Sequence, residues 1–132
     1  MATTILIVED DPAQLRFLDA VVSGLGYRVI TAAGEPEGLE ILLGAKPAQI
    51  DLVLLDLVMP EIDGFDVLDR VHPVRPSLPI IVLTMKGGVE TVVQVMRSGA
   101  VDFVVKPASP ERMQVSIENA LKISTLSGEV SP

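Results

Sequence analysis

The amino-acid sequence predicts an α/β fold of the (βα)₅ type, in which five parallel strands form one doubly wound sheet. Five short runs of β-branched and aliphatic residues recur at fairly even intervals along the 132-residue chain. Most of these runs are apolar at successive positions, which is typical of strands covered by helices on both faces. The segments between them carry apolar residues at helical spacing. Alternation of this kind implies right-handed crossovers and helices on both faces of the sheet.

The elements follow in chain order. We expect strands at Ile5–Val8, Arg28–Thr31, Leu52–Leu55, Ile80–Leu83 and Val101–Val105. Helical stripes are expected within Leu15–Leu25, Leu39–Leu43, Phe65–Val71, Val89–Met96 and Met113–Leu121. Because a helical segment separates each strand from the next, every pair of successive strands is predicted to run parallel.

Local signals mark the ends of several helices. Asp11 followed by Pro12, and Ser109 followed by Pro110, each resemble an N-cap with proline at the first helical position. Glycines are expected to end two helices, the first at Gly24 or Gly26 and the fourth at Gly99.

Length and composition are those of one globular domain. Apolar residues make up 48% of the chain and aromatic residues 3%, so the core is expected to be aliphatic. The chain has no cysteine, which excludes thiol catalysis and thiolate metal sites, and its lone His72 excludes a multi-histidine site within one chain. We expect a domain over residues 1–126, followed by a polar tail or linker stub at residues 127–132.

Charge and hydropathy argue against several classes of function. The net charge is −8, which argues against direct binding of nucleic acid by this segment. Residues 1–69 hold thirteen acidic and three basic residues, a net −10, whereas residues 70–132 hold five and seven, a net +2. No apolar run approaches the ~20 residues of a membrane span. The N-terminus also lacks the features of a signal peptide, so we expect a cytoplasmic protein without a membrane anchor.

Polar residues follow four of the five predicted strands. They are Glu9, Asp10 and Asp11 after the first strand, Asp56 after the third, Thr84 after the fourth and Lys106 after the fifth. Ligands of open α/β sheets bind at the carboxyl ends of the strands, so these side chains are expected to converge. Crowded carboxylates repel one another, and Mg²⁺, which prefers oxygen ligands, relieves that conflict. An aspartate in such a site can accept a phosphoryl group.

Each of these residues has an ordinary alternative explanation. An aspartate at the end of an apolar run is most often a turn or cap residue, and this is the favoured interpretation of Asp11. Thr84 and Lys106, taken singly, would be a strand-end threonine and a solvated lysine. The joint placement at the ends of four strands is what favours a phosphoryl site.

In this order the residues resemble the receiver domain of two-component response regulators. The matching stretches are ILIVEDDP at 5–12, LVLLDLVMPEIDG at 52–64, PIIVLT at 79–84 and GAVDFVVKP at 99–107. The resemblance covers residues 4–126 and implies a flavodoxin-like sheet with strand order 2-1-3-4-5.

The resemblance also implies a role for each matching residue. Asp56 corresponds to the phosphate acceptor. Mg²⁺ is expected to bind Asp10 directly, Glu9 through water, Asp56, and the backbone carbonyl of Val58.

Three further positions correspond to the switching machinery of the family. Thr84 corresponds to the hydroxyl that turns toward the phosphoryl group, and Lys106 to the lysine that pairs with it. Phe103 occupies the position of an aromatic switch that is often tyrosine. The bond between Lys106 and Pro107 is expected to be cis, as is typical of the family.

The resemblance therefore implies a switch that accepts a phosphoryl group from a histidine kinase or a phosphotransfer protein. It would catalyse its own phosphoryl transfer and a slow autodephosphorylation without being an enzyme in the usual sense. Phosphorylation would change the face formed by the fourth helix, the fifth strand and the fifth helix. That face would bind an effector domain, a partner protein or a second copy of the chain.

Several alternatives stay open at this point. The favoured role is the N-terminal receiver of a transcriptional response regulator, and a stand-alone receiver of a phosphorelay is an alternative. A Mg²⁺-dependent phosphohydrolase with an aspartyl nucleophile is an alternative of another class, although the second aspartate that such enzymes need is replaced by Val58. A purely structural receiver is a further alternative.

Overall fold

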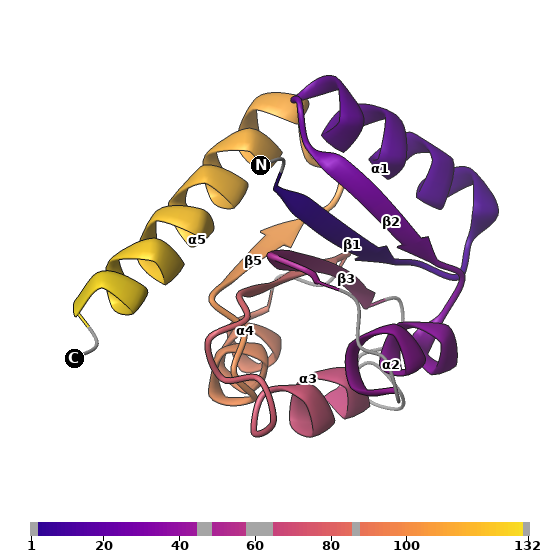
Figure 1. Ribbon diagram of the computed structural model, residues 1–132. Coiled ribbons are helices and arrows are strands. Elements are labelled where there is room, and N and C mark those ends of the chain that lie inside the picture. Colours follow the sequence, from indigo (N-terminus) through magenta and orange to yellow (C-terminus); the bar gives the residue numbers. More distant parts are fainter. Residues whose placement is uncertain (1–2, 45–48, 58–64, 86–87, 131–132) are drawn as a thin grey trace.

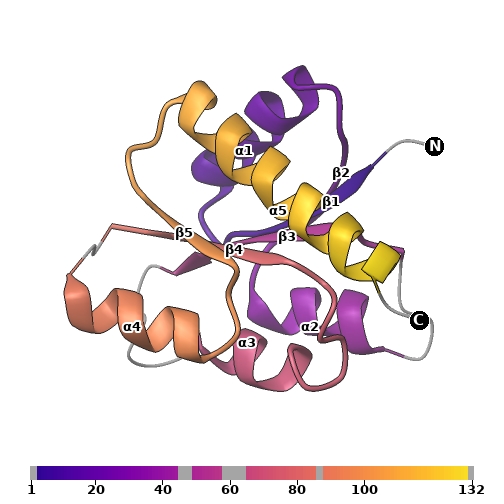
Figure 2. The same cartoon turned by 90° about the vertical axis from the view of Figure 1, so that its left-hand side faces the viewer.

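The computed structural model describes residues 3–44, 49–57, 65–85 and 88–130 and shows a three-layer α/β sandwich (Figure 1). A single parallel sheet forms the middle layer. Two helices, α1 (Pro12–Gly24) and α5 (Pro110–Val130), cover one face of it. The other face carries α2 (Glu35–Leu43), α3 (Phe65–Val71) and α4 (Val89–Arg97), and a view turned by 90° shows the same division (Figure 2).

The sheet has the predicted topology. Its strands are β1 (Thr4–Val8), β2 (Arg28–Ala32), β3 (Leu52–Leu57), β4 (Ile80–Thr84) and β5 (Asp102–Val105). All pairs are parallel, and the order is β2-β1-β3-β4-β5, so the predicted fold class and strand order are confirmed. The first four strands are one or two residues longer than expected, and β5 begins one residue later. Asp56 lies within β3 and Thr84 is the last residue of β4, instead of following these strands.

Alternation along the strands builds two separate apolar cores. In β1, Ile5 and Ile7 join the cluster beneath α1 and α5, whereas Leu6 and Val8 join the cluster beneath α2, α3 and α4. All four side chains are buried. Since successive residues of a strand point to opposite faces, a strand covered on both sides must be apolar throughout. The continuous apolar runs of the sequence have this cause.

The helix ends follow the local signals in the sequence. Asp11 caps α1 by accepting a hydrogen bond from the backbone N–H of Ala13 at 3.0 Å, and Pro12 opens the helix. The hydroxyl of Ser109 accepts from the backbone N–H of Arg112 at 3.1 Å at the start of α5. Gly99 follows α4 with a φ of +112°, a left-handed conformation that favours glycine. The predicted caps are thus confirmed.

The last helix extends further than the sequence suggested. α5 continues to Val130 and so includes residues 127–130, which we expected to begin a tail. The domain boundary at residue 126 stays a prediction. Within the described part of the chain, no helix combines the length and the hydropathy needed to cross a membrane.

Candidate functional site

Parallel pairing brings the predicted site residues to one edge of the sheet. Val8 pairs with Leu55 between β1 and β3, and Thr84 at the end of β4 pairs with Val105 at the end of β5. The residue that follows β1 is Glu9, and the residue that follows β5 is Lys106. Glu9, Asp56, Thr84 and Lys106 thus share the carboxyl edge, as predicted.

A buried ion pair forms the centre of this edge. The Lys106 ammonium donates a hydrogen bond to Oδ2 of Asp56. The Asp56 side chain has no exposed surface, and that of Lys106 is 15% exposed. The backbone N–H of Lys106 donates to the carbonyl of Thr84 at 2.8 Å, which fixes the start of the lysine side chain beside β4.

Glu9 is the second buried carboxylate of the site. Its backbone N–H donates to the carbonyl of Ala32 at 3.1 Å, and its Oε1 accepts from the backbone N–H of Asp11 at 2.9 Å. These bonds direct Oε2 toward the ion pair, where it lies 3.9 Å from the Lys106 ammonium. Neither backbone contact can be read from the sequence pattern, because one comes from a neighbouring strand and the other from the N-cap of α1.

Two carboxylate oxygens at this edge are buried and have no hydrogen-bond partner among the described residues. They are Oδ1 of Asp56 and Oε2 of Glu9. Buried polar atoms are nearly always paired, so unpaired oxygens in a site call for a bound group. Carboxylate oxygens are the donors that Mg²⁺ prefers. The donor chemistry of the edge thus fits a magnesium ion.

Asp10, which we also expected to bind magnesium, does not complete a metal site with these two carboxylates. The Asp10 residue is exposed. The described residues contain no group of three histidine, aspartate or glutamate side chains close enough to hold a metal, so Glu9, Asp10 and Asp56 do not form one in this arrangement. The positive charge beside Asp56 comes from Lys106. Val58 lies outside the described residues.

Burial has the largest effect on the pKa of Asp56, the candidate phosphate acceptor. Desolvation raises the pKa of Asp56 above its ordinary value, although the hydrogen bond and the charge of Lys106 act in the opposite direction. The Asp56 carboxylate is thus withheld from bulk water.

The two expected switch residues lie on neighbouring strands. Thr84 is 1% exposed at the end of β4. Phe103 of β5 is half-buried and packs against the core beneath α2, α3 and α4. The Lys106–Pro107 bond is cis, as expected.

One polar network was not predicted. The buried Ser116 of α5 donates a hydrogen bond to Oδ2 of Asp102 at 2.6 Å, and Arg112 lies 3.8 Å from the same oxygen. The other oxygen of Asp102 accepts from the backbone N–H of Phe103 at 2.8 Å. This network ties β5 to α5. The hydrogen-bonded side chains are 14 positions apart, and no local pattern marks such a contact.

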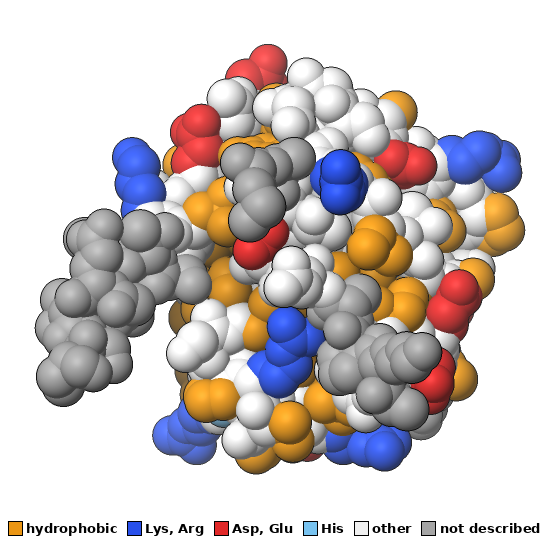
Figure 3. Space-filling view, viewed as in Figure 1, with side chains coloured by type: hydrophobic (Ala, Val, Ile, Leu, Met, Phe, Trp, Pro, Cys, Tyr) orange, Lys and Arg blue, Asp and Glu red, His pale blue; other side chains and the backbone are white. Residues whose placement is uncertain are grey.

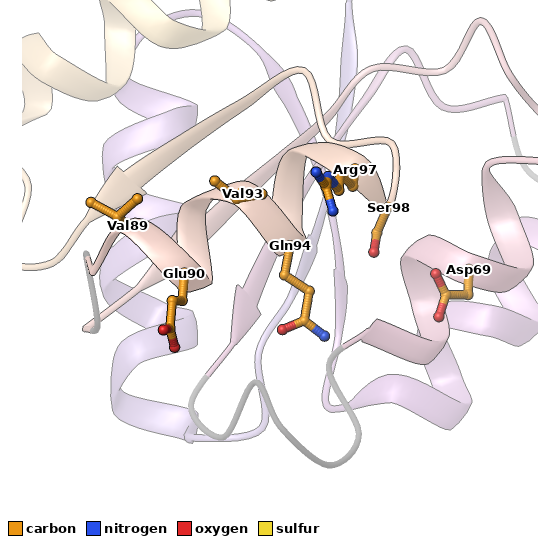
Figure 4. A pocket seen from close by; sticks show the side chains of 7 residues that line it. All are labelled: Asp69, Val89, Glu90, Val93, Gln94, Arg97 and Ser98. Carbon is orange, nitrogen blue, oxygen red and sulfur yellow. The ribbon is translucent and has the colours of Figure 1, made fainter.

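A groove of about 440 Å³ lies between α3 and α4 (Figure 4). Glu90 and Gln94 point the same way from α4, and Asp69 lies on α3 across from Ser98. None of the residues at the carboxyl edge lines it. The groove is therefore separate from the candidate site.

Comparison with known families identifies the family of this chain. Residues 5–118 match the family model described as the response regulator receiver domain. The chain belongs to this receiver-domain family. The implied fold and family are thereby confirmed, and the phosphohydrolase alternative loses its basis.

Relatives of this receiver domain include transcriptional regulators. It is 36% identical over 123 residues to the transcriptional regulatory protein ZraR of Klebsiella oxytoca, covering 93% of the chain and 27% of that protein. It is 35% identical over 120 residues to the transcriptional regulatory protein GlrR of Escherichia coli K12, covering 91% of the chain and 26% of that protein. The receiver domain thus spans about a quarter of the length of these relatives.

Solved structures agree with the fold. A CheY-like receiver domain of Methanospirillum hungatei has a TM-score of 0.86 at 28% identity, covering 96% of this chain and 99% of that one. NtrX of Brucella abortus, in complex with ADP, has a TM-score of 0.85 at 33% identity, covering 99% of this chain and 29% of that one.

Proposed function

We propose that this receiver domain accepts a phosphoryl group on Asp56 and acts as a phosphorylation-dependent switch. One observation carries the proposal. Oδ2 of the buried Asp56 carboxylate pairs with the Lys106 ammonium, while Oδ1 lies beside it without a partner. One carboxylate oxygen is therefore held and the other is free to react.

The chemistry follows from this division. An Asp56 oxygen attacks the phosphorus of a phosphohistidine or of a small phosphodonor. The bond from phosphorus to the leaving nitrogen or oxygen breaks, and its electron pair leaves with that group. An acyl phosphate forms on Asp56. Lys106 then faces the added negative charge, and a positively charged neighbour of this kind stabilises phosphoryl transfer.

A magnesium ion belongs to the same proposal. Asp10 and Asp56 would bind it directly, Glu9 through water, and Val58 through its backbone carbonyl. The two unpartnered oxygens of Asp56 and Glu9 support this assignment. When bound, the ion would neutralise the charge of the carboxylates and of the incoming phosphoryl group.

Switching would pass through Thr84 and Phe103 to the face formed by α4, β5 and α5. This face exposes apolar side chains that the fold itself leaves uncovered. The exposed residues are Val89 at 79%, Val93 at 41%, Met96 at 43% and Val105 at 42%. An exposed apolar patch of this kind suits a protein partner, which we propose to be an effector domain or a second receiver.

The named relatives support a role in transcription. Because the chain spans about a quarter of ZraR and GlrR, we propose that it is the N-terminal receiver of a transcriptional response regulator. A histidine kinase or phosphotransfer protein would supply the phosphoryl group. A stand-alone receiver of a phosphorelay is the second candidate.

Intact-mass measurement tests the proposal. The protein is incubated with phosphoramidate and Mg²⁺, and we expect one added phosphoryl group in the wild type and in the Asp66→Asn control. That control removes an exposed carboxylate of α3. Asp56→Asn is expected to gain none. Equal labelling of Asp56→Asn would overturn the assignment, and release of many equivalents of phosphate per protein would point to a phosphohydrolase.

A further inference from the structure

A polar cavity lies at the amino edge of the sheet, opposite Asp56. Its volume is about 810 Å³, and its walls come from the starts of β1 and β2, the residues before β3, and the segment between α3 and β4. The molecular face that carries the N-terminus shows basic side chains on two sides of an acidic one near its centre (Figure 3). The cavity is within the size range of small-molecule sites.

Arginine supplies most of the charge in this cavity. Arg28 from β2 and Arg75 from the segment before β4 both line it, together with one acidic residue, Asp51. Asp51 uses Oδ2 to accept a hydrogen bond from the backbone N–H of Thr4 at 2.8 Å. Among the described residues, neither guanidinium has a carboxylate oxygen within 4.0 Å. The residues that line the cavity thus carry two positive charges, neither paired with a described carboxylate, and one negative charge.

One of these guanidinium groups has a buried unsatisfied nitrogen. Nη1 of Arg75 has essentially no exposed surface and no hydrogen-bond partner in the described part of the chain. Burying a charged donor without an acceptor is costly, so a donor of this kind requires a partner. No described residue supplies such a partner, and the cavity beside this nitrogen is large enough for a ligand.

We propose that this cavity binds a small oxyanion, with Arg75 and Arg28 as its charged contacts. The guanidinium group presents its donors in a planar fork that matches the oxygens of phosphate and carboxylate. The shared chemistry is therefore an anionic oxygen group, carried by a phosphate or by a small carboxylic acid. This site is separate from the phosphoryl site, because the two lie at opposite edges of the sheet.

Two ordinary explanations compete with this proposal. A water molecule can satisfy Nη1 of Arg75, or Asp51 can pair with Arg75 by a side-chain rotation. In both cases Arg75 would matter for folding and an added anion would find no specific site. Direct measurement of anion binding separates these cases from a ligand site.

The experiment uses the Asp56→Asn protein without Mg²⁺, so that the phosphoryl site does not contribute. Amide NMR shifts are followed during titration with phosphate in one arm and with succinate in the other, at constant ionic strength set by chloride. We expect saturable shifts at Thr4, Arg28, Asp51 and Arg75. The arm with the lower dissociation constant identifies the class of anion.

Variants then assign the binding. Arg75→Gln is expected to raise the dissociation constant by about tenfold or more, as expected for the loss of a charge-assisted contact. Arg97→Gln, which removes an exposed arginine of α4, is the control and should bind as before. Arg75→Lys keeps the charge without the fork and should bind more weakly than the parent. If Arg75→Gln does not fold, Arg28→Gln serves the same purpose.

Three outcomes would overturn the proposal. They are shifts that grow linearly without saturation, shifts confined to the region of Lys106, and equal affinity in the Arg75→Gln and Arg97→Gln proteins. Because Asp56 is absent throughout, failure here leaves the proposed phosphoryl transfer untouched, and the mass experiment tests that transfer independently.

Discussion

The ammonium group of Lys106 is hydrogen-bonded to the carboxylate of Asp56, fifty residues earlier in the chain. Both side chains are largely withdrawn from water, so each charge depends on the other. The same ammonium lies 3.9 Å from Oε2 of Glu9, which places one positive charge between two buried carboxylates.

Replacing Lys106 by methionine should therefore affect both stability and chemistry. We expect the free energy of unfolding to fall by about 2 kcal/mol and the pKa of Asp56 to rise further, because a buried carboxylate loses its charged partner. Urea unfolding and carboxyl ¹³C NMR measure the two effects, and labelling by phosphoramidate should decrease. Lys122→Met, at an exposed lysine of α5, is the control. Equal changes in stability and in labelling in the two variants would contradict this account.

The raised pKa of Asp56 gives a pH dependence of definite sign. Burial raises its folded-state pKa above the unfolded value, so the folded protein binds this proton more tightly and gains stability as the pH falls through that pKa. At neutral pH the ionised carboxylate costs stability. Asp56→Asn should thus be more stable than the wild type at neutral pH, and the difference should shrink toward acid. Unfolding measured from pH 7 to pH 4 checks this, and a difference that widens would contradict it.

Gly99 is predicted to resist substitution for two reasons. Its φ of +112° disfavours other residues, and an added Cβ would lie 2.5 Å from the ring of His72 at the end of α3. Gly99→Ala should cost about 2–3 kcal/mol, the sum of backbone strain and overpacking. Thermal unfolding measures the change.

Two other glycines separate these causes. Gly26 also has a positive φ, of +98°, but open space around it, so Gly26→Ala should cost about 1–2 kcal/mol through strain alone. Gly24, at the end of α1, has neither feature, and its alanine variant should be neutral or slightly stabilising. Equal losses at Gly99 and Gly26 would mean that His72 yields to the added methyl group.

The contact between Ser116 and Asp102 offers a test of how β5 is held. Ser116→Ala removes a buried donor from the Asp102 carboxylate and should lower the free energy of unfolding by about 1–2 kcal/mol. Ser23→Ala removes a comparable hydrogen bond to Asp19 at an exposed position of α1 and should change little. Chemical denaturation compares the two. A loss at Ser116 no larger than that at Ser23 would mean that Arg112 and water replace the hydroxyl.

The fold could be predicted almost completely, because periodicity and capping are local signals. Asp11 and Ser109 cap the helices that the sequence indicated, and the apolar runs are the strands. The candidate site was predicted less completely. Its residue types were evident from the strand ends, but the pairing of Lys106 with Asp56 depends on side-chain directions across three strands. Long-range polar contacts, such as that between Ser116 and Asp102, leave no periodic trace in a sequence.

The apolar strands have a consequence for how the chain finds its alignment. In a sheet with one solvent-exposed face, burial of the apolar side chains fixes the register of a strand, because a shift of one residue would expose them. The central strands here are apolar on both sides, so a shifted strand would still bury its side chains well. Polar contacts at the two ends of the strands distinguish the correct register from a shifted one. Thr4 contacts Asp51 at one end, and Glu9 contacts Ala32 at the other. Polar residues at the rim of the sheet thus also fix the register of its strands.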